Sequence, residues 1–257
     1  MNWNIQRRAF VTIVRREIRR FMRIWLQTLV PPAITIALYF VVFGNLIGSR
    51  IGQMGGYDYM QFVVPGLIMM AVIQNSYANV VSSFFGSKFQ NNIEELLVSP
   101  VTEGVILAGY VVGGMMRGLI VGGIVTLMAL FFADLPIHNL WITLSMVFLT
   151  ALVFSIAGFI NAIFAESFDD ISIVPTFVLT PMIYLGGVFY SVSLLPDFWV
   201  KISLANPILY MVNGFRYGIL GSSDIDISRA YAMLLLFLFL GSAYALYLLK
   251  YAQRLRR

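Results

Sequence analysis

The sequence contains no cysteine, only one histidine and few charged residues. Without cysteine the chain has no disulfide, no thiol nucleophile and no cysteine metal ligand. His138, with Asp134 nearby, supplies neither a metal cluster nor a Ser-His-Asp set, so we predict no metal site and no catalytic residue. Charged residues form 11% of the chain, against roughly a quarter in ordinary soluble domains, and 60% of the residues are hydrophobic. This composition excludes an ordinary soluble protein.

The basic residues are concentrated at the two ends of the chain. Of seventeen lysines and arginines, seven lie between Arg7 and Arg23 and four between Lys250 and Arg257, and the formal net charge is +5. Basic ends beside long apolar stretches indicate contact with an anionic lipid surface. We therefore expect membrane lipids as partners and no nucleic acid.

Six apolar stretches are each about 20 residues long, which is enough to cross the hydrocarbon core of a bilayer. They predict an all-α polytopic membrane protein that forms a single transmembrane domain over residues 1–257. The predicted spans are Ile24–Ile47, Met60–Phe85, Val105–Phe132, Leu140–Phe164, Ile171–Val188 and Ala230–Leu249.

An even number of spans places both termini on the same side of the membrane. The two terminal segments carry most of the basic residues, whereas the loops around Arg50 and His138 have almost none. Because lysine and arginine accumulate in cytoplasmic segments, we predict that both termini are cytoplasmic.

Residues 5–23 form a separate amphipathic pattern. Apolar residues recur at helical spacing and arginines occupy the other side, which predicts an interfacial helix whose arginines face lipid phosphates. The alternative is a basic tail that only sets the topology. The apolar positions are Phe10, Val14, Ile18, Phe21 and Trp25, and the arginines are Arg8, Arg15, Arg16, Arg19 and Arg23.

Residues 189–221 do not form a clean span. Pro196 and Lys201 interrupt the first half, and the second half, residues 207–221, contains Arg216. Each half is too short and too polar for an independent crossing, so we predict re-entrant or outer-surface helices before the last span.

The loop between the second and third spans contains a short amphipathic pattern. Asn92 is suited to cap a helix with Glu95 three residues later, and Pro100 is suited to end it. The predicted helix, residues 91–99, either rests on the cytoplasmic membrane surface or docks into a groove on a partner protein. Its predicted contact residues are Asn92, Ile93, Glu94, Glu95, Leu96, Leu97 and Val98.

The string Glu-Glu-Leu-Leu-Val-Ser-Pro-Val at 94–101, preceded by Lys88, resembles the coupling-helix motif of type-2 ABC exporter permeases. The resemblance covers essentially the whole chain. It implies an exporter in a bacterial inner membrane, with two permease copies, expected as a homodimer, and two separate cytoplasmic ATPase subunits that contact residues 92–98. Further segments that resemble this family are Phe168–Ile171, Gly186–Tyr190, Asn206–Pro207 and Gly214–Arg216.

The sequence has no phosphate-binding loop of the form Gly-x-x-x-x-Gly-Lys-[Ser/Thr]. Its three lysines, Lys88, Lys201 and Lys250, all stand in other contexts. If ATP drives this protein, another chain must bind the nucleotide. We therefore expect no cofactor on this chain, and ATP with magnesium on a partner ATPase.

Arg117 lies near the middle of the third predicted span, where an arginine costs at least ~2.5 kcal/mol to insert. It can form an internal pair or bind a carbonyl, line the substrate path, or extend to the membrane surface. Our hypothesis is that Arg117 faces the permease interior and contacts anionic or polar parts of the cargo. Gln74, Asn75 and Asn79 of the second span either line the same path or bond between helices.

Glycines recur every fourth residue in the third span, at Gly114, Gly118 and Gly122, with Gly109 and Gly113 on a neighbouring line. Such lines let helices approach closely in lipid, so we predict a packing role. A flexible hinge is the alternative.

Together these features predict the permease subunit of an ATP-driven exporter. A secondary transporter or channel that works without an ATPase is the alternative, although the predicted spans lack the carboxylates typical of proton-coupled pumps. A membrane enzyme is a third class. Small lipophilic compounds, lipids and polysaccharides all remain candidate cargo.

Overall fold

The computed structural model describes residues 3–251, with the side chains of Asn45, Ser49, Glu94 and Leu97 outside that description, and the predicted basic residues beyond 251 also lie outside it. The long helices are α1 (Trp3–Arg23), α3 (Val30–Phe40), α5 (Tyr59–Phe89), α7 (Glu103–Ala129), α8 (Leu140–Phe164), α12 (Pro207–Leu220) and α13 (Ile227–Tyr251). The shorter elements are α2 (Trp25–Thr28), a π-helical segment (Val41–Gly48), α4 (Ser49–Ile51), β1 (Gln53–Met54), β2 (Tyr57–Asp58), α6 (Asn92–Val98), α9 (Asp170–Val174), a π-helical segment (Pro175–Leu179), α10 (Thr180–Tyr184), a 3-10 turn (Val192–Leu194) and α11 (Asp197–Leu204).

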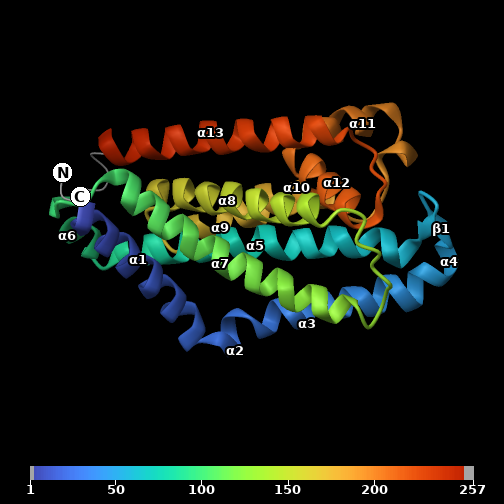
Figure 1. Cartoon of the computed structure of the whole chain (residues 1–257), viewed down its shortest axis with the longest axis horizontal. Coiled ribbons are helices and arrows are strands. Elements are labelled where there is room, and N and C mark those ends of the chain that lie inside the picture. Colours follow the sequence, from blue (N-terminus) through green and yellow to red (C-terminus); the bar gives the residue numbers. More distant parts are fainter. Residues whose placement is uncertain (1–2, 252–257) are drawn as a thin grey trace.

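The long helices form an elongated bundle (Figure 1). α5, α7, α8 and α13 run along its length, and α1 crosses it obliquely. The start of α1, the end of α13 and α6 lie at one end of the bundle, whereas α4, the β1–β2 hairpin and α11 lie at the other. The chain therefore has two distinct ends, and the elements predicted to be cytoplasmic share one of them.

The central helix is α5, which packs against α7 and α8. In an apolar 18-residue window of α5, 89% is buried inside the protein. The corresponding buried share is 12% for the segment Trp25–Gly48 and 17% for α13. The exposed sides of these two outer segments are rich in large apolar side chains. Apolar faces of this extent are stable against lipid or another protein, but not against water.

Five helices are long and apolar enough to cross a membrane: Trp25–Gly48, Tyr59–Phe89, Glu103–Ala129, Leu140–Phe164 and Ile227–Tyr251. They correspond to five of the six predicted spans, with boundaries that differ by a few residues. The all-α polytopic fold predicted from the sequence is confirmed.

The predicted fifth span, Ile171–Val188, differs from the structure. It is helical only from Asp170 to Tyr184, and Gly187 turns the chain with a φ of 70° soon afterwards. At 1.5 Å per residue this helix is about 22 Å long, shorter than the roughly 30 Å of a bilayer core. The helix is thus too short to cross alone, and the sixth crossing stays a prediction.

The region 189–221 folds into short helices, as predicted. α12 ends at Gly221, whose φ of 77° only glycine adopts without strain. The side chain of Arg216, only 1% exposed, donates from Nη2 to the Gly187 carbonyl at 2.7 Å and from Nε to the Phe62 carbonyl at 3.1 Å. Its guanidinium carbon also lies 3.8 Å from the centroid of the Phe62 ring. Arg216 therefore ties α12 to α5 and to the turn after α10.

α1 packs directly onto α7, and its buried stripe differs from the predicted one. The structure buries Gln6, Ile13, Glu17 and Phe21, whereas Trp25 is half exposed and lies beyond the end of α1. The cause is the first glycine line of α7. A Cβ at Gly109 would lie 2.6 Å from Ile13 Cγ2, and one at Gly113 would lie 2.5 Å from Glu17 Cβ. The five predicted arginines of α1 are all exposed.

The second glycine line of α7 faces α5. A Cβ at Gly114 would lie 2.3 Å from Val80 Cγ2, and one at Gly122 would lie 2.6 Å from Val72 Cγ2. At Gly118 the added atom would lie 1.8 Å from Ser76 Oγ and 3.1 Å from the Val72 carbonyl oxygen. The two lines thus place α7 between α1 and α5.

We predict that Gly118→Val destabilises the bundle by about 1–3 kcal/mol, the usual cost of overpacking a well-packed core. Gly123→Val is the matched control, because Gly123 lies on the same helix and has no atom within 4 Å of the added Cβ. Thermal unfolding of both variants in detergent measures the difference. Equal melting temperatures would show that the close approach of α7 and α5 is not needed for stability.

Candidate functional site

The predicted docking helix is present as α6, Asn92–Val98, at the end of the bundle that also holds the start of α1 (Figure 1). Ile93 is buried and anchors it to the bundle, whereas Val98 is 85% exposed. The predicted cap was wrong by one residue: Asn91, with a φ of 59°, precedes the helix, and Asn92 instead donates from Nδ2 to Gln90 Oε1 at 3.1 Å. The left-handed conformation of Asn91 changes the direction of the chain between α5 and α6, so that Asn92 is the first residue of α6.

The exposed part of α6 includes Glu95 as well as Val98. Glu94 and Leu97 were also predicted to contact a partner, but their side chains are outside the part of the chain that the structure describes. α6 therefore presents both a carboxylate and an apolar side chain outward, as a docking element requires.

The segment after α6 is held by α1. Gln6 donates from Nε2 to the Pro100 carbonyl at 2.7 Å and accepts from the backbone N–H of Thr102 at 3.0 Å. Both bonds join residues that are more than 90 positions apart in the chain. A displacement of α6 would thus act on α1 as well as on α5 and α7, which it connects.

Lys88 lies in the last turn of α5, close to the last turn of α8. Its Nζ donates to the carbonyls of Ile163 at 2.8 Å and Ala165 at 2.7 Å. A cation at a helix carboxyl end satisfies carbonyls that have no partner within the helix. Lys88 therefore joins the base of α8 to the segment that leads into α6.

Arg117 lies where α7, α5 and the break between α2 and α3 meet. Its Nη2 donates to the Thr28 carbonyl at 3.2 Å and to Asn75 Oδ1 at 3.3 Å. Thr28 ends α2, and Pro32 four residues later has no backbone N–H, so the Thr28 carbonyl is open to a side-chain donor. These contacts fit the interpretation of Arg117 as an internal carbonyl ligand.

The predicted pathway residues fall into two groups. Gln74 and Asn75 line a small cavity of about 260 Å³ between α3 and α5, and Arg117 bonds to Asn75. Asn79 is fully buried, and its Oδ1 accepts from Arg20 Nη2 at 2.9 Å. The structure thus brings three of the four residues together and places Asn79 in the contact between α1 and α5.

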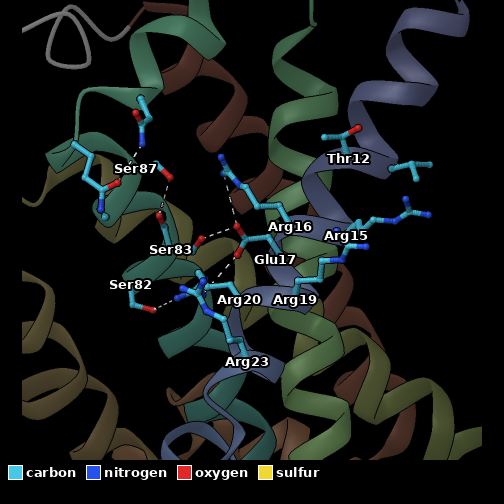
Figure 2. Close-up of a pocket in the computed structure, with 14 residues that line it drawn as sticks. Thr12, Arg15, Arg16, Glu17, Arg19, Arg20, Arg23, Ser82, Ser83 and Ser87 are labelled. Atoms are coloured by element: carbon cyan, nitrogen blue, oxygen red, sulfur yellow. Dashed lines mark hydrogen bonds and ion pairs between the residues drawn. The ribbon is translucent and has the colours of Figure 1, made fainter.

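A larger cavity of about 950 Å³ lies over α1, beside the last turns of α5 and the start of α6 (Figure 2). Glu17 lies at its base, fully buried, although the sequence analysis did not single it out. Ser83 Oγ donates to Glu17 Oε1 at 2.6 Å, and Arg16 and Arg20 approach the carboxylate at 3.7 and 3.6 Å. The signal in the sequence was a single acid within a run of arginines.

Within residues 3–251, no group of three or more His, Asp or Glu side chains is placed to hold a metal ion. The polar groups of the cavity and of the Arg117 cluster are mostly arginine, serine, asparagine and backbone carbonyls. Such groups bind and orient polar molecules, but they do not form a general acid–base pair.

Comparison with known proteins gives a consistent result. Residues 8–220 match the family model described as ABC-2 type transporter. The chain is 61% identical over 231 residues to the inner membrane transport permease YadH of Escherichia coli K12, covering 90% of each chain, and the Shigella flexneri protein of that name matches equally. It is 26% identical over 183 residues to nodulation protein J of Sinorhizobium fredii, covering 70% of this chain and 68% of the relative.

We predict that Glu17→Ala destabilises the protein by about 1–3 kcal/mol, because Ser83 and two arginines lose their buried acceptor. Glu95→Ala removes an exposed carboxylate from α6 and should change stability by less than about 0.5 kcal/mol. Thermal unfolding in detergent compares the two. If both variants have the melting temperature of the wild type, the buried carboxylate does not hold α1 in place.

Proposed function

The chain belongs to the ABC-2 type transporter family and is the transmembrane subunit of an ABC transporter, and from this premise we propose that it exports its cargo using ATP hydrolysed on separate ATPase subunits. The observation that carries the proposal is α6, a helix that joins α5 to α7, is anchored by the buried Ile93, and exposes Val98. The 257 residues contain no phosphate-binding loop, so we assign ATP and magnesium to the partner.

In the proposed cycle, closure of two ATPase subunits on ATP moves α6. α6 passes the movement to α5 and α7 through the chain, and to α1 through the bonds of Gln6 to residues 100 and 102. These helices then reopen the path on the other side of the membrane. The mechanism needs rigid connections rather than flexible ones, and the hydrogen bonds at 2.7 and 3.0 Å supply them.

We place the protein in a bacterial inner membrane with both termini in the cytoplasm. Support comes from the name of the relative with 61% identity and from the basic residues of α1, which lie at the same end as α6.

We also propose a second, identical permease copy. The half-exposed to exposed apolar residues of the Asp170–Tyr184 segment, among them Ile173 and Phe177, are available for a partner or for lipid. A monomeric permease in the assembled complex, measured by native mass, would refute the homodimer.

We predict that a photo-crosslinking amino acid at Val98 traps an ATPase chain in membranes of the native host. Phe131 is the matched control, because it is 88% exposed, near the 85% of Val98, and follows the opposite end of α7. The crosslinked partner is identified by mass and by ATP-dependent release. A partner trapped equally at both positions, or none at Val98, contradicts the proposed docking role and favours a channel or secondary transporter.

The transport path is proposed to run past Gln74, Asn75 and Arg117. These residues combine a cavity with polar groups at the depth of the spanning helices, and polar groups there tend to mark a path. The Arg117 contacts with Thr28 and Asn75 support a structural role as well, because both bonds remain inside the protein.

The absence of native cysteine allows a direct test of the path. We predict that Gln74→Cys reacts with a water-soluble maleimide while the transporter turns over, because the thiolate forms only where water reaches it. Leu38→Cys is the control, since Leu38 is 61% exposed on the apolar side of α3 and faces lipid or a partner. Labelling is read by mass spectrometry, and equal labelling of the two sites would place water-filled space elsewhere.

A further inference from the structure

The cavity of about 950 Å³ over α1 is lined mainly by charged and polar side chains. Five arginines line it, Arg15, Arg16, Arg19, Arg20 and Arg23, and Glu17 is its one acid. The opposite wall is α5, which contributes Ser82, Ser83 and Ser87. The volume lies at the upper end of the range for small-molecule sites.

Most of this positive charge is not compensated by the protein. Glu17 pairs only with Arg16 and Arg20, and these two side chains turn toward it in Figure 2. Arg15 and Arg19 extend away from Glu17, and within residues 3–251 neither they nor Arg23 has a side-chain hydrogen bond or ion pair. Five like charges on one cavity wall repel one another within the Debye length of about 10 Å, so an anion stabilises the arrangement.

A phosphate group fits these donors better than a carboxylate does. Guanidinium groups bind phosphate oxygens in pairs, and three unpaired arginines offer more donors than one carboxylate can accept. Arg20 adds a buried Nε atom with no hydrogen-bond partner in the structure. The cavity is therefore built for an anion with several oxygens.

The surroundings of the cavity favour a lipid as the source of that phosphate. Val11 lines the cavity and is half exposed, and Met22 and Trp25 are half exposed close to Arg23. Exposed apolar side chains beside a cluster of arginines are typical of a helix at the boundary of headgroups and acyl chains. Acyl chains would cover these residues, whereas a free phosphate ion would leave them in water.

We propose that the cavity between α1 and the end of α5 binds the phosphate headgroup of an anionic phospholipid. The arginines of the site belong to α1, although Asn92 at the start of α6, a predicted ATPase contact, also lines the cavity. None of the lining residues belongs to the transport path proposed above. The bound headgroup neutralises the arginines of α1 and so holds α1 against α5 and α7. Because Gln6 of the same helix bonds to residues 100 and 102, occupancy of the site also stabilises the segment that follows α6.

The test is a binding titration of the purified full chain in a neutral detergent. The probes are dihexanoyl phosphatidylglycerol, dihexanoyl phosphatidylcholine and inorganic phosphate, and calorimetry gives each dissociation constant. Phosphatidylglycerol should bind at least tenfold more tightly than either other probe. The double variant Arg19→Gln with Arg23→Gln should bind it roughly thirtyfold more weakly, since each basic residue near an anionic lipid contributes about a factor of five.

The control is the double variant Arg7→Gln with Arg8→Gln, which removes the same charge from the same helix but outside the cavity. Its affinity should equal that of the wild type. The variant Arg19→Lys with Arg23→Lys keeps the charge and should retain binding within a few-fold. Retained binding shows that the glutamine pair binds weakly because charge is lost and not because substitution at these positions disrupts the fold. Melting temperatures of all variants are measured alongside.

Three outcomes overturn the proposal. Equal weakening by both glutamine pairs means diffuse attraction of lipid to α1 rather than a site. Equal affinity for phosphatidylcholine removes the charge selectivity. Equal affinity for inorganic phosphate assigns the cavity to a free anion instead of a lipid.

Discussion

The close approach of α7 to two neighbouring helices is the constraint on which the rest of the structure depends. One line of glycines admits α1 and the other admits α5, and the nearest atom to each added Cβ would lie at 1.8 to 2.6 Å. In lipid there is little hydrophobic gain from bringing helices together, so backbone proximity and interhelical polar contacts must supply the association. α7 meets both requirements because its glycines leave room for polar side chains of α1 and α5.

Polar contacts between helices explain how the charged side chains that lie between them are stable inside a membrane protein. Glu17 meets Ser83, Arg20 meets Asn79, and Arg117 meets Thr28 and Asn75, all at helix contacts. An unpaired polar group away from water costs several kcal/mol, so contacts within the protein are favoured. The pairing is not complete, because Arg20 Nε, Asn79 Nδ2 and Arg117 Nε have no hydrogen-bond partner among the described residues. The same contacts connect α1, α5 and α7 into one unit, and this unit carries α6. A force applied at α6 is therefore distributed over three helices rather than absorbed by one loop.

Several features followed directly from the sequence. Five of the six spans predicted from the apolar stretches are long apolar helices in the structure, because length and composition alone decide what a bilayer accepts. The helix at Asn92–Val98 followed from its amphipathic pattern and from Pro100, and the short helices before the last span followed from Pro196 and Lys201, which interrupt the apolar stretch. The family resemblance rested on the same local motifs, and the family match over residues 8–220 confirms it.

Other features were decided only by the tertiary structure. The buried stripe of α1 is Gln6, Ile13, Glu17 and Phe21 because α7 offers glycines opposite it, and hydrophobic periodicity alone favoured another stripe. Glu17 could not be recognised as buried, since its burial depends on Ser83 from a helix more than 60 residues away. Asn79 was expected either to line the path or to bond between helices, and it bonds to Arg20 of α1. Local sequence determines which helices form and where they end, whereas the partners of polar side chains depend on which helices come into contact.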